Sequence, residues 1–420
     1  MSLKEAFEAS KLTPALANSS KTLIEWREQP SIFKRYPHFL FSYHLNAKDP
    51  LDQFFLSLRA ITHTTPMADK PYHKLNVPSA GNLHPIEIYI QFRKVPGKLS
   101  GIYHLNVEKN KLVLIQEIEK DGVEYFFDYG LRQEGIFIFF SSVYFRSSWK
   151  YSFRAWRYLL LDMGHQLAAL KLLSHYHDRE LIFLKSKQHR ALEDYLGFMQ
   201  GEQLLATAAL ISPLKRAVTK PLQNCMQVHA TDYSFPQPIL EETLKNFQPY
   251  HDKKLSYLPF LYHDKKELTN AMQNRRSARK FSDSAIDEAV LELLLHMLSR
   301  VEGSLGFYYA LLKSENQPLG IYHQDTLLKK GSFVHEIEYL LLSQAIAGTS
   351  TIVFFLTTTS ITSHAFYNAG IFAHELYLFC SQHNIGCSGV GAYFDDSTKT
   401  FLQTDEDIIY CFCIGENKGA

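Results

Sequence analysis

Several features that would place a chain in a simple class are missing from this sequence. It has no excess of charge, because its 44 Lys and Arg residues are balanced by 43 Asp and Glu residues. A chain without a net basic field has no general attraction for nucleic acid or for an anionic membrane surface. It also lacks a long apolar run, since the strongest, residues 135–145, is too short to span a bilayer. With no apolar signal core near its first residue, the chain is expected to be cytoplasmic and to bind neither nucleic acid nor membranes.

Recognisable metal and nucleotide motifs are missing as well. The five cysteines form no CxxC pair, which favours buried thiols in a reducing compartment. There is no HExxH, and His175 and His177 are two positions apart, so on a helix they would not share a face. The stretch around Gly389 and Gly391 has Phe394 where a dinucleotide fingerprint requires glycine, and no Walker A loop occurs. We therefore predict no metal site, no Rossmann domain and no P-loop.

An internal repeat is the main organisational signal that the sequence does contain. Five segments of the first half resemble five of the second in the same order. The pairs are 86–94 with 305–313, GIYH at 101–104 with GIYH at 320–323, 135–142 with 350–357, 163–173 with 369–379, and 201–212 with 405–416. Four of these pairs predict strands, and the pair beginning at 163 and 369 has helical spacing. We predict two α+β domains, 20–215 and 255–420, joined by a linker at 216–254.

The first chemistry-bearing stretch, VPSAGNLHPIEIY, precedes a predicted strand. Its small residues would let backbone approach a flat ligand closely, and its amide can both donate and accept hydrogen bonds. The candidate cofactor-binding residues here are Pro78, Ser79, Ala80, Gly81 and Asn82. An ordinary strand-entry turn is the alternative interpretation.

The second stretch, QNRRSARKFS, gathers cations around a serine. If the backbone is extended, Arg275, Ser277 and Arg279 point to one face, and such a set suits a phosphate because guanidinium matches its oxygens. The alternative is a solvated basic turn. Downstream, Ser284 and Asp287 have the spacing of a capping box that would open a helix. The first half has no equivalent of this stretch, and the second half has no equivalent of PSAGN, so each half holds one motif that the other lacks.

Two further stretches complete the candidate set. Lys150 and Tyr151 stand just before a predicted long helix and could donate and accept protons if burial shifts their pKa values. The alternative is a surface lysine beside a half-buried tyrosine. The glycine-rich run after the second long helix could turn backbone N–H groups toward a ligand. Its candidate residues are Gly389, Val390, Gly391 and Ala392.

Together these motifs resemble a known family. RRSARKF is similar to the Arg-x-Ser-x-Arg/Lys-x-Phe opening of the FMN-dependent nitroreductase fold, and PSAGNLHPIEIY is similar to its Pro-Ser-x-x-Asn element. The run from PSAGN to KYSFRAWRYLLLDMGHQLAAL resembles the SagB-type branch, which includes azoline dehydrogenases. The resemblance spans about residues 50–215 and 265–415. At the C-terminus, where relatives often place a basic phosphate ligand, this chain has only Lys418.

The resemblance implies a tandem nitroreductase-like fold that forms an intramolecular pseudo-dimer with one composite FMN site. Arg275, Ser277 and Arg279 would hold the phosphate and ribityl chain, and backbone at 389–392 would face the flavin N5 region. Residues 78–82 of the other half would close over the ring system. Lys150 and Tyr151 match the Lys-Tyr pair of the azoline dehydrogenases in place and order. Further oligomerisation stays open.

The sequence is compatible with three functions. The first is dehydrogenation of an azoline-bearing or similar peptide with hydride transfer through flavin N5. The second is reduction of a nitro compound, quinone or other small electrophile with NAD(P)H. The third is a flavin- or peptide-binding module without turnover.

Overall fold

The computed structural model describes residues 1–19, 24–67, 70–127, 131–217, 219–251, 264–298 and 305–417. The chain divides into two compact units, which are described separately below. The first unit is Glu25–Ser256, and the second combines Met1–Ile24 with Tyr257–Ala420. Within the described ranges, no helix is both long enough and apolar enough to cross a membrane.

The first unit is built on a seven-stranded sheet of order β1-β6-β5-β4-β7-β9-β8, with a separate β2-β3 hairpin. Its strands are β1 Ser42–His44, β2 Ile61–Met67, β3 Lys70–Leu75, β4 Ile86–Arg93, β5 Gly101–Asn106, β6 Lys111–Glu117, β7 Leu131–Val143, β8 Ile182–Phe183 and β9 Glu202–Ala217. Its α-helices are α3 Pro50–Leu58, α4 Tyr144–Tyr151, α5 Ala155–Tyr176, α6 His189–Tyr195 and α7 Pro238–Leu244. Its 3-10 turns are η1 Trp26–Glu28, η2 Ala80–Asn82, η3 Val123–Phe126 and η4 Ser152–Arg154.

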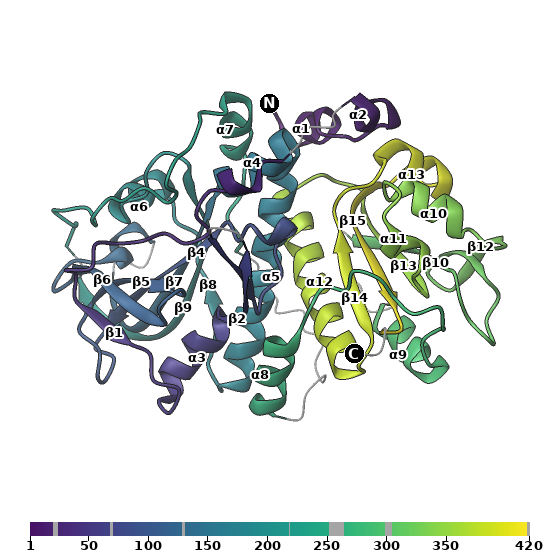
Figure 1. Ribbon diagram of the computed structural model, residues 1–420. Coiled ribbons are helices and arrows are strands. Elements are labelled where there is room, and N and C mark those ends of the chain that lie inside the picture. The colour runs from purple at the N-terminus through teal and green to yellow at the C-terminus, as the bar shows by residue number, and fades with distance from the viewer. Residues whose placement is uncertain are drawn as a thin grey trace. The chain divides into compact units, whose positions relative to one another are not determined.

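The second unit contains a six-stranded sheet of order β12-β11-β10-β13-β15-β14. Its strands are β10 Leu305–Leu311, β11 Gly320–His323, β12 Thr326–Lys330, β13 Ile352–Thr358, β14 Gly386–Val390 and β15 Asp407–Gly415. Its helices are α1 Leu3–Ala9, α2 Pro14–Ser19, α8 Lys265–Asn274, α9 Glu288–Leu298, α10 Val334–Leu340, α11 Ala345–Gly348, α12 Ser363–Gln382 and α13 Asp395–Leu402. In each unit the sheet is twisted and a long helix, α5 or α12, packs against its own strands (Figure 1).

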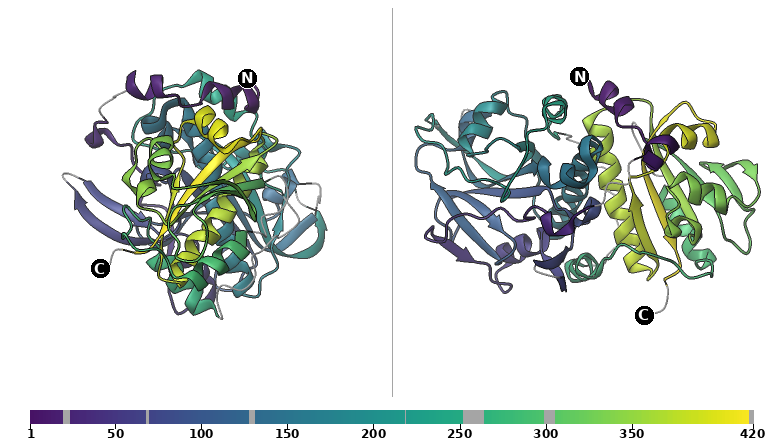
Figure 2. Two further views of the ribbon diagram at one scale, coloured as in Figure 1. Left: turned by 90° about the vertical axis from the view of Figure 1, so that its right-hand side faces the viewer. Right: turned by 45° about the horizontal axis from the view of Figure 1, so that its top comes forward.

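The predicted duplication is visible in the strand order. Apart from the extra edge strand β1, the two sheets follow the same path through corresponding strands. The ladders agree residue by residue, because Tyr89 pairs with His104 in one unit and Tyr308 with His323 in the other. The register also shifts at equivalent points of the β5–β6 and β11–β12 pairs, after Ile102 and after Ile321. Figure 2 shows the two sheets from two further directions. The α+β class and the duplication are thereby confirmed, with one large sheet in each unit.

The ladders correct one part of the sequence alignment. Matching 135–142 with 350–357 places Phe139 on Phe354. In the structure Tyr89 pairs with Phe139, and its equivalent Tyr308 pairs with Phe355. The true offset is therefore one residue larger. Both runs are continuously apolar because both faces of these strands are buried, so the pattern could not fix the register.

The segment predicted as a linker packs within the first unit. Cys225 belongs to the unit's hydrophobic core, and Tyr250 is fully buried. The Tyr250 amide donates to the Leu205 carbonyl at 2.8 Å, which fixes residues beyond α7 on the sheet. At the other end, residues 1–24 join the second unit, where Lys4 pairs with Asp407 at 2.6 Å and the Leu12 amide donates to Asp395 at 2.8 Å. All five cysteines are buried thiols, in line with the sequence-based interpretation.

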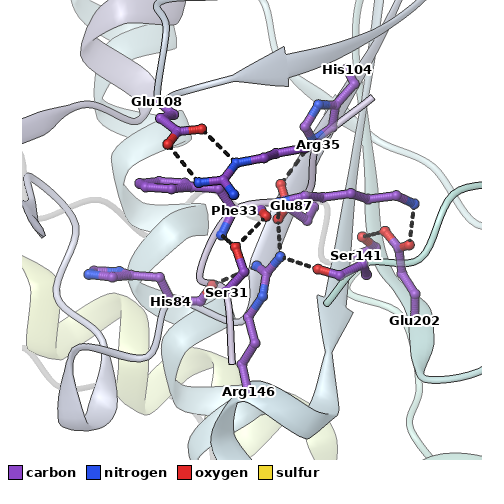
Figure 3. Close-up of polar contacts among 12 residues, drawn as sticks. Ser31, Phe33, Arg35, His84, Glu87, His104, Glu108, Ser141, Arg146 and Glu202 are labelled. Carbon is purple, nitrogen blue, oxygen red and sulfur yellow. Dashed lines mark hydrogen bonds and ion pairs between the residues drawn. The ribbon is translucent and has the colours of Figure 1, made fainter. Parts of the chain in front are cut away.

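A buried polar network underlies the first sheet (Figure 3). Lys34 pairs with Glu202 at 2.6 Å, and Arg146 pairs with Glu87 at 2.6 Å. Burial alone would raise the pKa of Glu87, but the Arg146 charge and a hydrogen bond from His104 outweigh it and hold that pKa far below its usual range. Arg146 also donates to the His84 carbonyl at 3.0 Å. Through this hydrogen bond, the network fixes the backbone that follows the PSAGN turn.

Candidate active site

The PSAGN stretch of the first unit is a tight turn stabilised by one buried carboxylate. The Ser79 hydroxyl donates to Asp162 at 2.6 Å, and the Ala80 amide donates to the other oxygen of the same carboxylate at 3.0 Å. The His84 amide then donates to the Ser79 hydroxyl at 2.9 Å. Asp162 lies on the buried helix α5, so a long-range contact fixes the turn.

The side chain of Asn82 also contributes to the turn. Its amide group donates to the His73 carbonyl at 2.6 Å, and its oxygen lies 2.9 Å from His84 Nε2. Asn82 itself has a φ of 60°, a left-handed conformation that asparagine tolerates better than most residues. Both functions of the amide are thus used within the chain, and a ligand would meet mainly the backbone of this turn.

The structure brings Lys150 and Tyr151 to the same turn. They are the last residues of α4, which ends where Ser152 takes a φ of 48°. A methyl group on Gly81 would lie 2.6 Å from the Tyr151 hydroxyl and 3.2 Å from Lys150 Nζ. Because Gly81 also has a φ of 62°, only glycine is easily accommodated there. Two motifs that are far apart in sequence therefore share one small site.

Aromatic rings surround the Lys-Tyr pair. Lys150 Nζ lies 4.7 Å from the Trp26 ring centroid and 5.2 Å from that of Tyr151. The Tyr151 ring packs edge-on against Tyr158, with centroids 4.6 Å apart. These contacts orient both side chains and place the ammonium group in the cation–π range.

Asp162 is a site residue that sequence reasoning missed. Burial raises the pKa of Asp162 to about 7, even though its hydrogen bonds from Ser79 and Ala80 act in the opposite direction. A lone acidic residue within the apolar run RYLLLDMGHQLA was the available signal. Its role as the hydrogen-bond acceptor of the PSAGN turn is visible only in the tertiary structure.

The Asp162 pKa predicts a pH dependence of stability. An acid whose folded-state pKa lies above its unfolded value stabilises the fold fully at low pH, and that contribution is lost as pH rises toward 7. In the wild type, the free energy of unfolding should fall by on the order of 4 kcal/mol over this pH range. In Asp162→Asn this decrease should be absent. Urea denaturation at several pH values between 4 and 8 measures the difference.

Asp194→Asn is the matched control, because Asp194 is exposed in the same unit. Its curve of unfolding free energy against pH should run parallel to that of the wild type. If the Asp162→Asn curve also runs parallel, the buried carboxylate does not titrate in this range and the prediction is wrong.

In the second unit, the RRSAR segment is organised around Tyr377 of α12. Arg275 is buried, and its guanidinium carbon lies 5.0 Å from the centroid of the Tyr377 ring. The Ser277 and Tyr377 hydroxyls are 3.0 Å apart, and the Gly389 amide donates to the Tyr377 hydroxyl at 2.7 Å. Sequence reasoning missed Tyr377, which connects two of the predicted motifs.

The phenylalanine of the motif attaches the segment to the sheet. Phe281 is fully buried against the two opposed glycines Gly386 and Gly415. A methyl group on either glycine would lie 2.6–2.7 Å from the ring. The Ala278 amide also donates to the Cys387 carbonyl at 2.9 Å. Residues 275–281 are therefore held along the β14 edge of the sheet.

A cavity of about 790 Å³ lies beside this segment in the second unit. Its wall includes two guanidinium groups, Arg275 and Arg276, and one carboxylate, Glu267. Burial lowers the pKa of Arg275, which reflects the cost of holding a cation away from water. The cavity therefore has the charge and the donors to accept an anion.

Three details of the second unit differ from expectation. Arg279 is exposed and does not line the cavity, whereas Arg276 does, so the alternation of an extended strand does not hold here. The glycine-rich run begins as the edge strand β14, with Val390 buried in the core, and only Gly391 and Ala392 follow it. Helix α9 begins at Glu288 and is capped by Asp287, which accepts from the amides of residues 289 and 290. The predicted capping box at Ser284 is wrong.

Comparison with known proteins addresses the second half directly. Residues 272–416 match the family model described as Nitroreductase family. No curated protein sequence matches the chain. A crystal structure of a candidate nitroreductase from Anabaena variabilis superposes with a TM-score of 0.80 at 20% identity, covering 99% of each chain. The nitroreductase-like fold therefore extends over the whole chain, including the half that the family model does not match.

Shorter nitroreductases match one part of the chain. Nitroreductase A from Vibrio parahaemolyticus is 13% identical over 36% of this chain and 68% of its own, with a TM-score of 0.29. A candidate nitroreductase from Ralstonia eutropha is 18% identical over 42% of this chain and 90% of its own, with a TM-score of 0.30.

Proposed function

We propose that the protein is an FMN-dependent oxidoreductase. The observation that carries this proposal is the Arg275–Tyr377–Gly389 cluster at the edge of a large cavity, within the segment that matches the nitroreductase family. The residues fit a phosphate-bearing cofactor, because the cavity wall carries two guanidinium groups. The volume of the cavity also lies within the range of roughly 300–1,000 Å³ that is typical of ligand sites. Arg275 and Arg276 would bind the phosphate, with Arg279 as an outer cation.

We further propose that the PSAGN turn belongs to the same FMN site. This part is supported by the sequence, where each half lacks the motif that the other carries. The backbone of residues 78–82 would cover the ring system, and the backbone of 389–392 would face N5. One chain would then have one complete site and one that has lost its motifs.

Bound FMN would supply two-electron redox chemistry. The chain's own contribution is to orient the reactants, exclude water and move the proton that accompanies hydride transfer. Lys150 and Tyr151 are suited to that last role, because both lie against Gly81 and neighbouring aromatic rings hold them in place.

The favoured reaction is dehydrogenation of an azoline-bearing or similar peptide. Aromatisation of an azoline removes a hydride and a proton from the ring, so it needs a hydride acceptor and a base, and dioxygen would be the final oxidant. The Lys-Tyr pair favours this reaction over simple reduction. The family match favours the second candidate, reduction of a nitro compound or quinone with NAD(P)H.

Spectroscopy and turnover test the proposal in sequence. The purified protein should show a flavin spectrum that dithionite bleaches, and mass spectrometry should identify released FMN. The dehydrogenase should consume oxygen when given an azoline peptide, whereas the reductase should oxidise NAD(P)H with a nitro compound. A bleachable flavin with neither activity would identify a binding module. A colourless protein that does not bind added FMN contradicts the proposal.

A further inference from the structure

A second cavity, of about 310 Å³, lies entirely within the first unit. Its walls come from η1, residues 29–35 and strand β3 of the hairpin, together with Asn82, Glu108 and Asp232. Figure 3 labels four of its lining residues, Ser31, Phe33, Arg35 and Glu108. None of the motifs singled out in the sequence lines this cavity except Asn82.

The walls of the cavity are largely apolar and include several aromatic rings. Phe33 and His73 lie against each other with ring centroids 5.4 Å apart, and Trp26 and Tyr72 add two further rings. Burial lowers the pKa of His73, and the Arg35 charge lowers it further against the opposing charge of Glu108. Such a wall suits a planar aromatic or heteroaromatic group.

The charged side chains of the lining are three cations, Arg27, Arg35 and Lys70, and two carboxylates, Glu108 and Asp232, so cations are in excess. Glu108 holds Arg35 through two hydrogen bonds, of 2.9 and 2.7 Å, and Lys70 donates to the Gln29 carbonyl at 3.2 Å. Among the residues that the structure describes, none accepts a hydrogen bond from the guanidinium of Arg27. A carboxylate on the ligand would provide that acceptor.

The cavity borders the Lys-Tyr pair through two residues. Trp26 forms part of the wall and also lies 4.7 Å from Lys150 Nζ. Asn82 forms another part and is the neighbour of Gly81, against which Tyr151 packs. A ligand seated here would have one end close to the residues proposed to move the proton.

We propose that this cavity is the substrate-recognition site, and that it binds a planar aromatic or heteroaromatic group carrying a carboxylate. Trp26 and Phe33 contact the ring, and Arg27 binds the carboxylate. The assignment of this ligand as the substrate rests on the proposed function, whereas the binding site itself rests on the cavity alone.

Calorimetric titration of the full chain with 4-nitrobenzoate, without reductant, tests this proposal. Trp26→Ala and Arg27→Gln should each raise the Kd roughly tenfold. The neutral 4-nitrobenzamide should lose affinity with Trp26→Ala but not with Arg27→Gln. Phe39→Ala and Arg190→Gln, both at exposed positions outside the cavity, are the matched controls and should leave the Kd unchanged.

The outcomes separate this proposal from the flavin assignment. The cavity assignment is wrong if the wild type does not bind the probe, or if neither variant changes the Kd. In that case a flavin spectrum would still support the proposed function. If the probe binds through Trp26 and Arg27 but the protein holds no FMN, the binding site stands and the oxidoreductase proposal fails. Arg275→Ala should leave the Kd unchanged, and loss of probe binding in that variant would place the probe at the flavin instead.

Discussion

Replacing Arg275 with alanine is expected to lower the affinity for FMN roughly 10- to 100-fold, so that the purified variant loses its flavin absorption. Arg275 is the buried cation of the RRSAR segment, it lies over the ring of Tyr377, and it lines the large cavity of the second unit. A hydrogen bond between charged groups is strong where water is excluded, so its loss should be severe. Fluorescence titration of the apo-protein with FMN measures the change.

A series of variants tests this explanation. Arg275→Lys keeps the charge but loses the planar fork, so its affinity should fall between those of the wild type and the alanine variant. Arg279→Ala should have a smaller effect than Arg275→Ala, because Arg279 is exposed and outside the cavity wall. Lys330→Ala removes an exposed cation elsewhere in the same unit and is the control. If Arg275→Ala retains full FMN occupancy with an unchanged circular dichroism spectrum, the phosphate assignment is wrong.

Replacing Lys150 with alanine is expected to reduce turnover about 10²- to 10⁴-fold, the usual contribution of a positioned acid or base, while FMN content stays at the wild-type level. Lys150 Nζ lies beside Gly81 and over the Trp26 ring, so its removal eliminates the proposed proton-transfer group without disturbing the RRSAR segment. Steady-state oxygen consumption with an azoline peptide, together with the flavin spectrum, measures both quantities.

Tyr151→Phe separates the hydroxyl from the ring. It preserves the edge-on contact with Tyr158 but removes the oxygen that approaches Gly81. A proton-transfer role predicts that kcat falls and that one limb of its pH profile is displaced, whereas a purely structural role predicts an unchanged profile. Trp149→Phe, a conservative change next to the pair, should keep the wild-type profile. Full turnover by both Lys150→Ala and Tyr151→Phe would exclude the pair from the chemistry.

Much of the fold could be predicted because the repeated strands and helices have a local hydrophobic periodicity that the sequence shows directly. The strands at 86–94 and 305–313 and the helices at 163–173 and 369–379 formed where the sequence placed them. The register between 135–142 and 350–357 could not be predicted, since strands buried on both faces carry no alternation to fix it. The segment at 216–254 appeared to be a linker because it is polar on average, yet Cys225 and Tyr250 within it are buried in the first unit.

By itself, the sequence determined that the chain is duplicated and that its halves carry different motifs, and it predicted chemistry near PSAGN, Lys150–Tyr151 and RRSAR. Only the tertiary structure decided which atoms of those motifs meet. It placed Gly81 against Lys150 and Tyr151, set Asp162 beneath the turn, and joined Arg275 to Gly389 through Tyr377. It also buried Arg275 and left Arg279 in water. The physical reason is that periodicity records which residues are apolar, whereas burial of a charge depends on which distant segment packs over it.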